Sequence, residues 1–185
     1  TRLKLQLAFL KQQDLAKKMG DDIEEMEKML NEYLEFSKYQ KNENTEMVSL
    51  NSLIENVVKN YDNNKITLSL ENIPKINVRP NAIKRCLSNL IDNGLSYGQN
   101  IKIYSKEKLN SIIIIMDDDG PGIPINEFKN VLKPFYRIDK SRGQNKSGVG
   151  LGLSITNDIL RSHGGQIVLD KSPLSGLRVK LTFPS

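Results

Sequence analysis

The chain has 185 residues, 38% hydrophobic and 26% charged, a balance that is typical of a folded protein and excludes a disordered one. Its 27 basic residues are mixed with 22 acidic ones, and no basic stripe is interleaved with aromatics, so nucleic acid is not expected as a partner. The single cysteine, Cys86, excludes an internal disulfide and, on an apolar helix face, is expected to pack in the core.

Residues 1–40 have the hydrophobic pattern of a helical hairpin. One apolar stripe is formed by Leu3, Leu7 and Leu10. Gly20, Asp21 and Asp22 are expected to interrupt the pattern, and a second, nearly heptad stripe follows at Ile23, Met26, Leu30 and Tyr33. Two short helices cannot bury both stripes alone. A second copy completing a four-helix bundle would cover them, and so would the remainder of the same chain.

The first residue, Thr1, already stands inside this amphipathic pattern, without a signal-peptide layout. We therefore expect the chain to be part of a longer protein. No apolar run reaches the roughly 18 residues of a membrane span, which says nothing about the parent protein.

After a polar linker at 41–45, short strands alternate with longer helices. Strands are expected at 48–50, 66–70, 76–78, 101–105, 112–116, 166–170 and 177–183. Helices are expected at 53–61, 79–97 and 151–161. Residues 120–148 have little periodicity, as in a long functional loop. This order predicts an α+β sandwich, with a mixed sheet covered on one face by helices.

The long helix at 79–97 carries two carboxamides one turn apart, Asn89 and Asn93, followed by Ser96 and Tyr97. Carboxamides on a helix are usually solvated surface groups. Beside a glycine, however, two of them can offer oxygen ligands to Mg²⁺, which takes one or two protein oxygens together with nucleotide phosphates.

Four isoleucines then run into three aspartates and a Gly-Pro-Gly turn, in "IIIIMDDDGPGIP". A buried strand that ends in a polar turn would explain the pattern, but acids at such a place need partners. A carboxylate here can accept a hydrogen bond from an exocyclic amine such as adenine N6. A metal cluster is the competing use, although no His, Cys or second acidic group stands nearby in sequence.

A third block, "KPFYRIDKSRG", supplies aromatic and basic side chains, and a fourth, "KSGVGLGLSI", alternates glycines before an apolar helix. A dinucleotide fingerprint should follow the first strand of a βαβ unit, and a phosphate loop should carry G-x-x-x-x-G-K-[ST]. Neither condition is met. The remaining mechanism is a glycine-bearing helix N-terminus that presents N–H groups to a phosphate.

Taken together, the four blocks in this order resemble the ATP-binding domain of sensor histidine kinases, over residues 46–185. Residues 1–43 resemble the dimerisation hairpin of the same family, and "TRLKLQLAFL" with "SNLIDNGLSYG" is most similar to the osmosensor-type, EnvZ-like group. The resemblance implies a Bergerat-type fold, a mixed sheet with three helices that is shared with gyrase, Hsp90 and MutL ATPases. It implies ATP and Mg²⁺ as cofactors.

By position in the family's motifs, the resemblance implies a Mg²⁺ ligand at Asn93, a neighbouring phosphate or metal contact at Asn89, and an adenine acceptor at Asp118. Catalytic roles are implied for Asn89, Asn93 and Arg137, the last of which would meet the γ-phosphate. The other implied nucleotide-binding residues are Tyr97, Gly120, Gly122, Ile123, Phe135, Lys146, Ser147, Gly148, Val149, Gly150, Leu151, Gly152, Leu153 and Thr182. Residues between the third and fourth blocks would form the ATP lid.

Two details refine the implied mechanism. Hydrolytic relatives carry a glutamate four residues before the metal asparagine, where this chain has Asn89, which cannot serve as a general base. The γ-phosphate is therefore expected to wait for a protein nucleophile, with catalysis by positioning and charge neutralisation. The family's acceptor histidine precedes the segment that Thr1 continues, and the single histidine, His163, is expected to be structural or solvent-facing.

The resemblance thus implies the catalytic core of a two-component kinase, which moves the γ-phosphoryl group from ATP to a hairpin histidine and then to a response-regulator aspartate. An OmpR-like regulator and a homodimer through the hairpin are the implied partners. The implied location is the cytoplasmic side of a membrane-anchored bacterial protein of the inner membrane. Two alternatives stay open: an ATP-hydrolysing relative of the same fold, and a non-catalytic nucleotide-binding module.

Overall fold

The computed structural model describes residues 43–138 and 150–184, and, in the first 42 residues, positions 17, 19–24, 26, 27, 30 and 34. The chain divides into two compact units, Thr1–Asn42 and Glu43–Ser185. In the first unit, residues 19–24 are helical, including Gly20, Asp21 and Asp22. The interruption expected at this group was therefore wrong, because a glycine costs a helix only about 1 kcal/mol and does not by itself end one.

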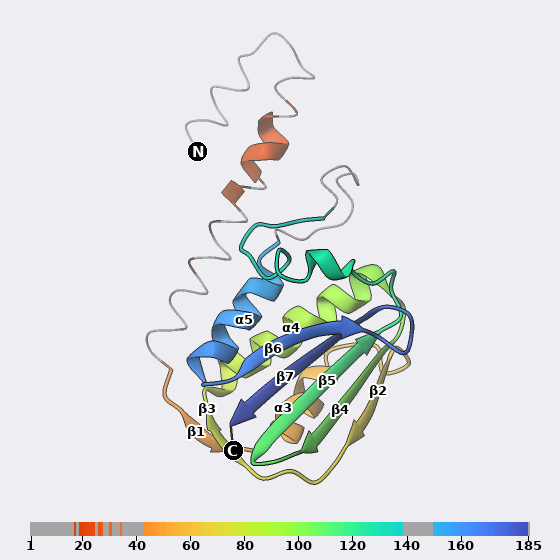
Figure 1. The fold of residues 1–185 in the computed structure, drawn as a ribbon. Coiled ribbons are helices and arrows are strands. Elements are labelled where there is room, and N and C mark those ends of the chain that lie inside the picture. Colours follow the sequence, from red (N-terminus) through yellow and green to blue (C-terminus); the bar gives the residue numbers. More distant parts are fainter. Residues whose placement is uncertain are drawn as a thin grey trace. The chain divides into compact units, whose positions relative to one another are not determined.

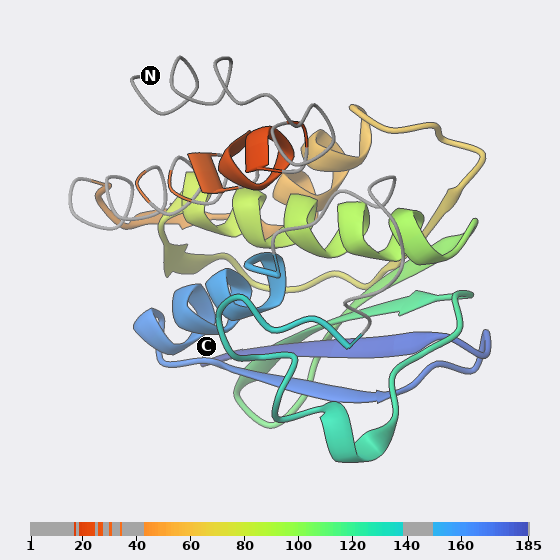
Figure 2. The same ribbon diagram turned by 90° about the horizontal axis from the view of Figure 1, so that it is seen from above.

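The second unit is a sheet with helices on one face (Figures 1 and 2). Its helices are α3 (Leu50–Val58), α4 (Pro80–Tyr97) and α5 (Gly152–Ser162), with a short 3₁₀ turn, η1 (Ile125–Glu127). Its strands are β1 (Glu46–Val48), β2 (Ile66–Leu70), β3 (Ile76–Val78), β4 (Ile101–Glu107), β5 (Ser111–Asp118), β6 (Gln166–Lys171) and β7 (Leu177–Pro184). Along the described residues, no helix is long and apolar enough to cross a membrane.

The main sheet has the strand order β2-β4-β5-β7-β6, and β1 pairs with β3 in a separate ribbon. Only β2 and β4 are parallel, so the sheet is mixed, as predicted from the sequence. The alternation within the strands decides which face is covered. On β7, Leu177, Val179, Leu181 and Phe183 are buried under the helices, and the residues between them are half-buried on the other face.

Element boundaries moved where capping, rather than hydrophobicity, sets them. The strand expected at 48–50 ends at Val48, because Ser49 caps α3 through a hydrogen bond from the Ser52 N–H to its hydroxyl (3.3 Å). The helix expected at 53–61 accordingly begins at Leu50 and ends at Val58. Cys86 is completely buried on α4, as expected of a core residue.

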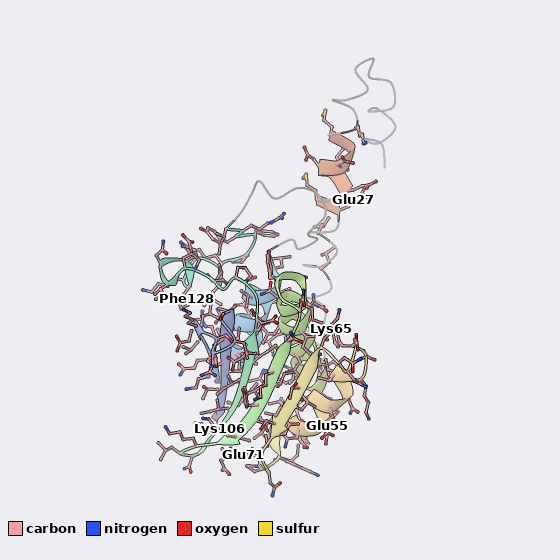
Figure 3. All side chains as sticks on the ribbon, turned by 90° about the vertical axis from the view of Figure 1, so that its right-hand side faces the viewer. Glu27, Glu55, Lys65, Glu71, Lys106 and Phe128 are labelled. Carbon is pink, nitrogen blue, oxygen red and sulfur yellow. The ribbon has the colours of Figure 1, made fainter. Side chains whose placement is uncertain are left out.

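Register fixes the two ends of the sheet. Asp117 pairs with Lys102 and Arg178, whereas Ile113 pairs with Lys106 and Thr182. In Figure 3, the labelled residues Lys65 and Phe128 lie toward the Asp117 end of the sheet, and Lys106 and Glu71 lie at the opposite end. The Asp117 end, together with the loop that carries Phe128, is where most of the implied site residues lie.

Candidate functional site

The three consecutive aspartates at the end of β5 have three different sets of partners. Asp117 is fully buried on the sheet face away from the helices and forms a two-point ion pair with Arg178, with both N···O distances 2.7 Å. Asp119 accepts hydrogen bonds from the Gln99 and Asn100 N–H groups (2.6 and 2.9 Å). These bonds lower the pKa of Asp119, and the bond from the Asn100 N–H has the largest effect. The carboxylates of Asp117 and Asp119 therefore already have hydrogen-bond partners within the fold. Of the three aspartates, only Asp118 faces the helices.

Asp118 is 8% exposed, and its Oδ1 accepts hydrogen bonds from two backbone N–H groups, Gly120 (2.9 Å) and Leu177 (3.1 Å). Burial raises the pKa of this carboxyl, and the two N–H groups oppose the rise. With Oδ1 engaged, Oδ2 is the oxygen that remains for an outside donor.

Glycines surround Asp118 because no side chain fits there. A Cβ at Gly176 would lie 2.1 Å from Asp118 Oδ1, and a Cβ at Gly120 would lie 3.0 Å from the same atom. At Gly94 a Cβ would come within 3.5 Å of the Asp118 Cβ, which places α4 directly beside this residue. Gly122 has a φ of +71° and lies against the Gly176 carbonyl, and the adjacent Ile123 is half-buried.

Helix α4 also reaches the glycine-rich segment. The Asn89 side chain donates to the carbonyl oxygen of Gly152 (3.4 Å), the first residue of α5, and Asn93 stands half-buried one turn farther along α4. Tyr97, at the end of α4, is half-exposed, and its carbonyl group lies 3.2 Å from where a Cβ of Gly120 would be. One helix thus contacts both the Asp118 surroundings and the start of α5.

These carboxamides fit a hard divalent ion. In the described parts of the chain no group of three or more His, Cys, Asp or Glu side chains could hold a metal. Mg²⁺ typically keeps several waters and takes only one or two protein oxygens beside phosphates, a requirement that Asn93 and Asn89 can meet.

The aromatic-basic block packs against the glycine run through its backbone. The Phe135 N–H donates to the Gly150 carbonyl (3.0 Å), and a Cβ at Gly150 would lie 2.8 Å from the Tyr136 carbonyl oxygen. Phe135 has a φ of +62° and is half-exposed, and the aliphatic part of Arg137 lies beside Gly150. The backbone of the third block therefore fixes where the fourth block begins.

Sequence reasoning missed the residues that hold this loop. The Tyr136 hydroxyl donates to the Glu127 carboxylate (2.6 Å), which also accepts from Asn130 (3.1 Å). The bond from Tyr136 lowers the pKa of Glu127 and raises that of Tyr136. A Glu followed nine residues later by a Tyr has no periodicity that would indicate a contact, because the intervening chain is irregular.

The first turn of α5 begins without a side-chain cap. Leu151 occupies the N-cap position and makes no side-chain cap hydrogen bond, so the N–H groups of Gly152 and Leu153 are not capped by a side chain. Gly150, with a φ of +77°, makes the turn into this helix. Lys146, Ser147, Gly148 and Val149, which were also implied as nucleotide contacts, lie outside the described residues.

Thr182 is not brought together with the other implied residues. It pairs with Ile113, at the Lys106 end of the sheet, and lies on the face away from the helices, with its Oγ1 buried and without a partner among the described residues. Arg178, four positions earlier, is roughly 13 Å closer to Asp118 along the strand. The β7 contact to Asp118 is instead the Leu177 N–H, a backbone group that no motif could reveal.

The chain is similar to known proteins in both sequence and fold. The sequence pattern of the histidine kinase-, DNA gyrase B-, and HSP90-like ATPases matches residues 78–185. All of the chain aligns with the sensor histidine kinases GtrS of Pseudomonas aeruginosa (33% identical) and CpxA of Escherichia coli (31%). It spans only 38% and 43% of these two proteins.

Among solved structures, the histidine kinase domain of the Escherichia coli osmosensor EnvZ matches with a TM-score of 0.58 at 31% identity, over 78% of this chain and 91% of that one. The α+β fold expected from the sequence is thereby confirmed. Similar identities to GtrS, CpxA and EnvZ do not single out the osmosensor group.

Proposed function

Because the chain belongs to the histidine kinase-, DNA gyrase B- and HSP90-like ATPase family, we propose that it is the catalytic part of a sensor histidine kinase. In this proposal it binds ATP with Mg²⁺ and transfers the γ-phosphoryl group to a histidine. One observation carries the proposal: α4 contacts the Asp118 surroundings through Gly94 and the start of α5 through Asn89, so a base site and a phosphate site share one helix.

At the base site, Asp118 Oδ2 accepts a hydrogen bond from the adenine amino group, while Oδ1 stays on the Gly120 and Leu177 N–H groups. At Gly120 and Gly176 the backbone packs directly against Asp118, so no side chain at either position covers its carboxylate. Gly122 lies against the Gly176 carbonyl and the Tyr97 carbonyl lies beside Gly120, and Ile123, next in sequence to Gly122, belongs to the same proposed site.

At the phosphate site, the first N–H groups of α5, at Gly152 and Leu153, bind the phosphates, and Arg137 neutralises charge on the γ-phosphate. Asn93, with Asn89 beside it, would hold Mg²⁺, which offsets the charge of the phosphate oxygens when it is bound. A carboxamide at position 89 cannot take a proton from water, so the phosphoryl group goes to a protein nucleophile instead.

The acceptor in this proposal is a hairpin histidine that is not among these 185 residues. His163, the one histidine in the sequence, has both ring nitrogens hydrogen-bonded within the fold and so is not available as a nucleophile. An OmpR-like response regulator that takes the phosphoryl group, pairing of two chains through the hairpin, and a membrane-anchored parent with this domain in the cytoplasm belong to the same proposal.

The test is to mix the chain with [γ-³²P]ATP, Mg²⁺ and a separate hairpin that carries the acceptor histidine. We expect label on the hairpin that is stable to base and labile to acid, and little release of inorganic phosphate without the hairpin. Asn93→Ala and Asp118→Ala serve as controls and should both abolish labelling. Phosphate release at the same rate with and without the hairpin would favour a simple ATPase, and no binding of ATP would favour a non-catalytic module.

A further inference from the structure

The start of α4 is held by side chains that come from distant parts of the second unit. Helix N-termini leave N–H groups without partners, and Arg79 at the N-cap makes no side-chain cap bond. Instead, Glu43 accepts hydrogen bonds from the Asn81 N–H (2.6 Å) and the Ala82 N–H (3.1 Å). We call the group formed by Glu43, Arg79, Ser162 and His163 the α4 anchor.

Within the anchor, His163 accepts a hydrogen bond from the backbone N–H of Arg79. Its Nδ1–H donates to the Ile159 carbonyl (2.7 Å), which leaves Nε2 as the acceptor for the Arg79 backbone N–H (3.0 Å). The guanidinium of Arg79 reaches the same end of α5, with Nε 3.4 Å from Nε2 and Nη2 bonded to the Ser162 hydroxyl. This pattern needs the neutral imidazole, because a proton on Nε2 would face an N–H donor and a guanidinium.

We propose that His163 is a positioning residue for the nucleotide site: when neutral it ties the start of α4 to the end of α5, and its protonation loosens that tie and weakens nucleotide binding. The inference rests on the proposed function, because the bound nucleotide is its readout. The kinase site would thereby respond to acidification through a group that touches neither substrate nor metal.

The contacts between α4 and α5 connect His163 to the proposed phosphate site. Helices α4 and α5 pack against each other, and hydrogen bonds link Arg79 to His163, Cys86 to Thr156 and Asn89 to Gly152. Asn89 lies ten residues beyond Arg79, about 15 Å along a stiff helix, so a shift of the α4 start is carried to the Asn89–Gly152 contact. Gly152 begins the turn whose N–H groups bind phosphate in the proposed function.

The charged groups facing the ring set the direction of the effect. Burial lowers the pKa of His163 most, and Arg79 adds to the lowering, while the Ile159 carbonyl and Glu43 act in the opposite sense. His163 is therefore neutral at pH 7 and gains its proton only below its ordinary pKa of about 6.5. Nucleotide affinity is expected to fall as the pH drops through that region.

Because the sequence has one histidine, the imidazole signals in a proton NMR spectrum report on His163 alone. The experiment is to titrate these signals with and without saturating Mg²⁺ and AMPPNP. Linkage requires that, if protonation weakens binding tenfold, saturation lowers the pKa of His163 by one unit. We expect a fall of at least about half a unit, equivalent to a roughly threefold change in affinity.

A matched variant separates the anchor from the nucleotide's own titration. In His163→Gln the amide oxygen can still accept from the Arg79 N–H but cannot be protonated. The pH dependence that remains, from the phosphate, which titrates near pH 6, and from Asp118, is common to the variant and the native chain. Calorimetric affinities between pH 5.5 and 7.5 should therefore vary less in the variant than in the native chain. Equal variation in both proteins would overturn the inference.

The outcomes also separate this inference from the proposed function. If AMPPNP binds and the pKa of His163 does not move, the positioning role is wrong and the proposed function stands. If AMPPNP binds at no pH, both are wrong. The titration uses the native chain, so it decides the question even if His163→Gln does not fold.

Discussion

Asp117, Asp118 and Asp119 show how neighbouring residues of one type are divided among roles by strand geometry. Because side chains alternate along β5, Asp117 lies on the sheet face away from the helices, where it pairs with Arg178, and Asp118 lies on the face toward the helices. Asp119 lies beyond the strand and accepts hydrogen bonds from the chain that leaves α4. Only one of the three carboxylates keeps an oxygen for a ligand.

Asp118→Asn tests that oxygen with little disturbance of the fold. The amide oxygen can keep the Gly120 and Leu177 N–H bonds, but Nδ2 then presents a donor where adenine also presents one. We expect a loss of ATP affinity of up to roughly a hundredfold, since an unsatisfied buried donor costs about 1–3 kcal/mol. Calorimetry with ITP, whose base carries an acceptor at this place, should show a smaller loss. Equal losses for both nucleotides would contradict the assignment.

Gly176→Ala tests whether the base site depends on close backbone packing. The new Cβ would lie 2.1 Å from Asp118 Oδ1 and 2.4 Å from its carbonyl oxygen, so the start of β7 must move and the Leu177 N–H bond is lost. We expect lower stability, by about 2 kcal/mol in urea unfolding, and loss of ATP binding. An unchanged affinity would show that the Leu177 N–H does not position Asp118.

At the scale of elements, two glycines at the start of α5 have different requirements. Gly150 has a φ of +77° and no room for a Cβ, whereas a Cβ at Gly152 would have only ordinary contacts, the nearest 3.7 Å away on Asn89. Gly150→Ala should lower ATP affinity about tenfold through strain of about 1–2 kcal/mol, with the fold kept. Gly152→Ala is the matched control, and calorimetry should find it close to the native chain. Similar affinities for the two variants would contradict this distinction.

Strands β5 and β7 are joined by the Asp117–Arg178 pair at the site end of the sheet. Arg178→Leu leaves Asp117 buried without its cation and should lower the free energy of unfolding by about 2–4 kcal/mol, less than for a wholly buried pair because Arg178 is partly exposed. Asp117→Val with Arg178→Leu should recover much of this loss. Urea unfolding of the single and double variants measures the coupling, and additive losses would contradict it.

Elements could be predicted from the sequence where hydrophobic period decides them. The alternation of Ile66–Leu70 and the run of four isoleucines in β5 predicted strands that the structure contains. The spacing of Asn89 and Asn93 predicted that both lie on one side of a helix, which is α4. What the sequence could not show depends on pairing across many residues. The Leu177 bond to Asp118 spans 59 positions and Glu43 reaches Asn81 across 38, and neither leaves a local pattern. Thr182 was expected at the base pocket, but its pairing with Ile113 puts it at the other end of the sheet. The sequence does not show this strand register.

At the scale of the whole molecule, the single histidine should leave a mark on stability against pH. The folded state holds the pKa of His163 below its ordinary value, so the unfolded chain binds more protons between the folded pKa and about 6.5. The free energy of unfolding should therefore rise with pH through this window and become flat above pH 7. The slope from one group cannot exceed about 1.4 kcal/mol per pH unit.

The carboxyl groups act at lower pH and in two directions. Asp119 and Glu127 have lowered pKa values, so their contribution is lost as the pH falls through the acid range. Asp118, whose pKa is raised, contributes in the opposite sense, because its charged form is the less stable one in the fold. Urea unfolding of the native chain and of His163→Gln, measured at half-unit steps from pH 5 to 8, removes these shared terms by subtraction. The difference should rise with pH and level off above about 6.5, and a difference that is flat throughout would show that the ring titrates equally in both states.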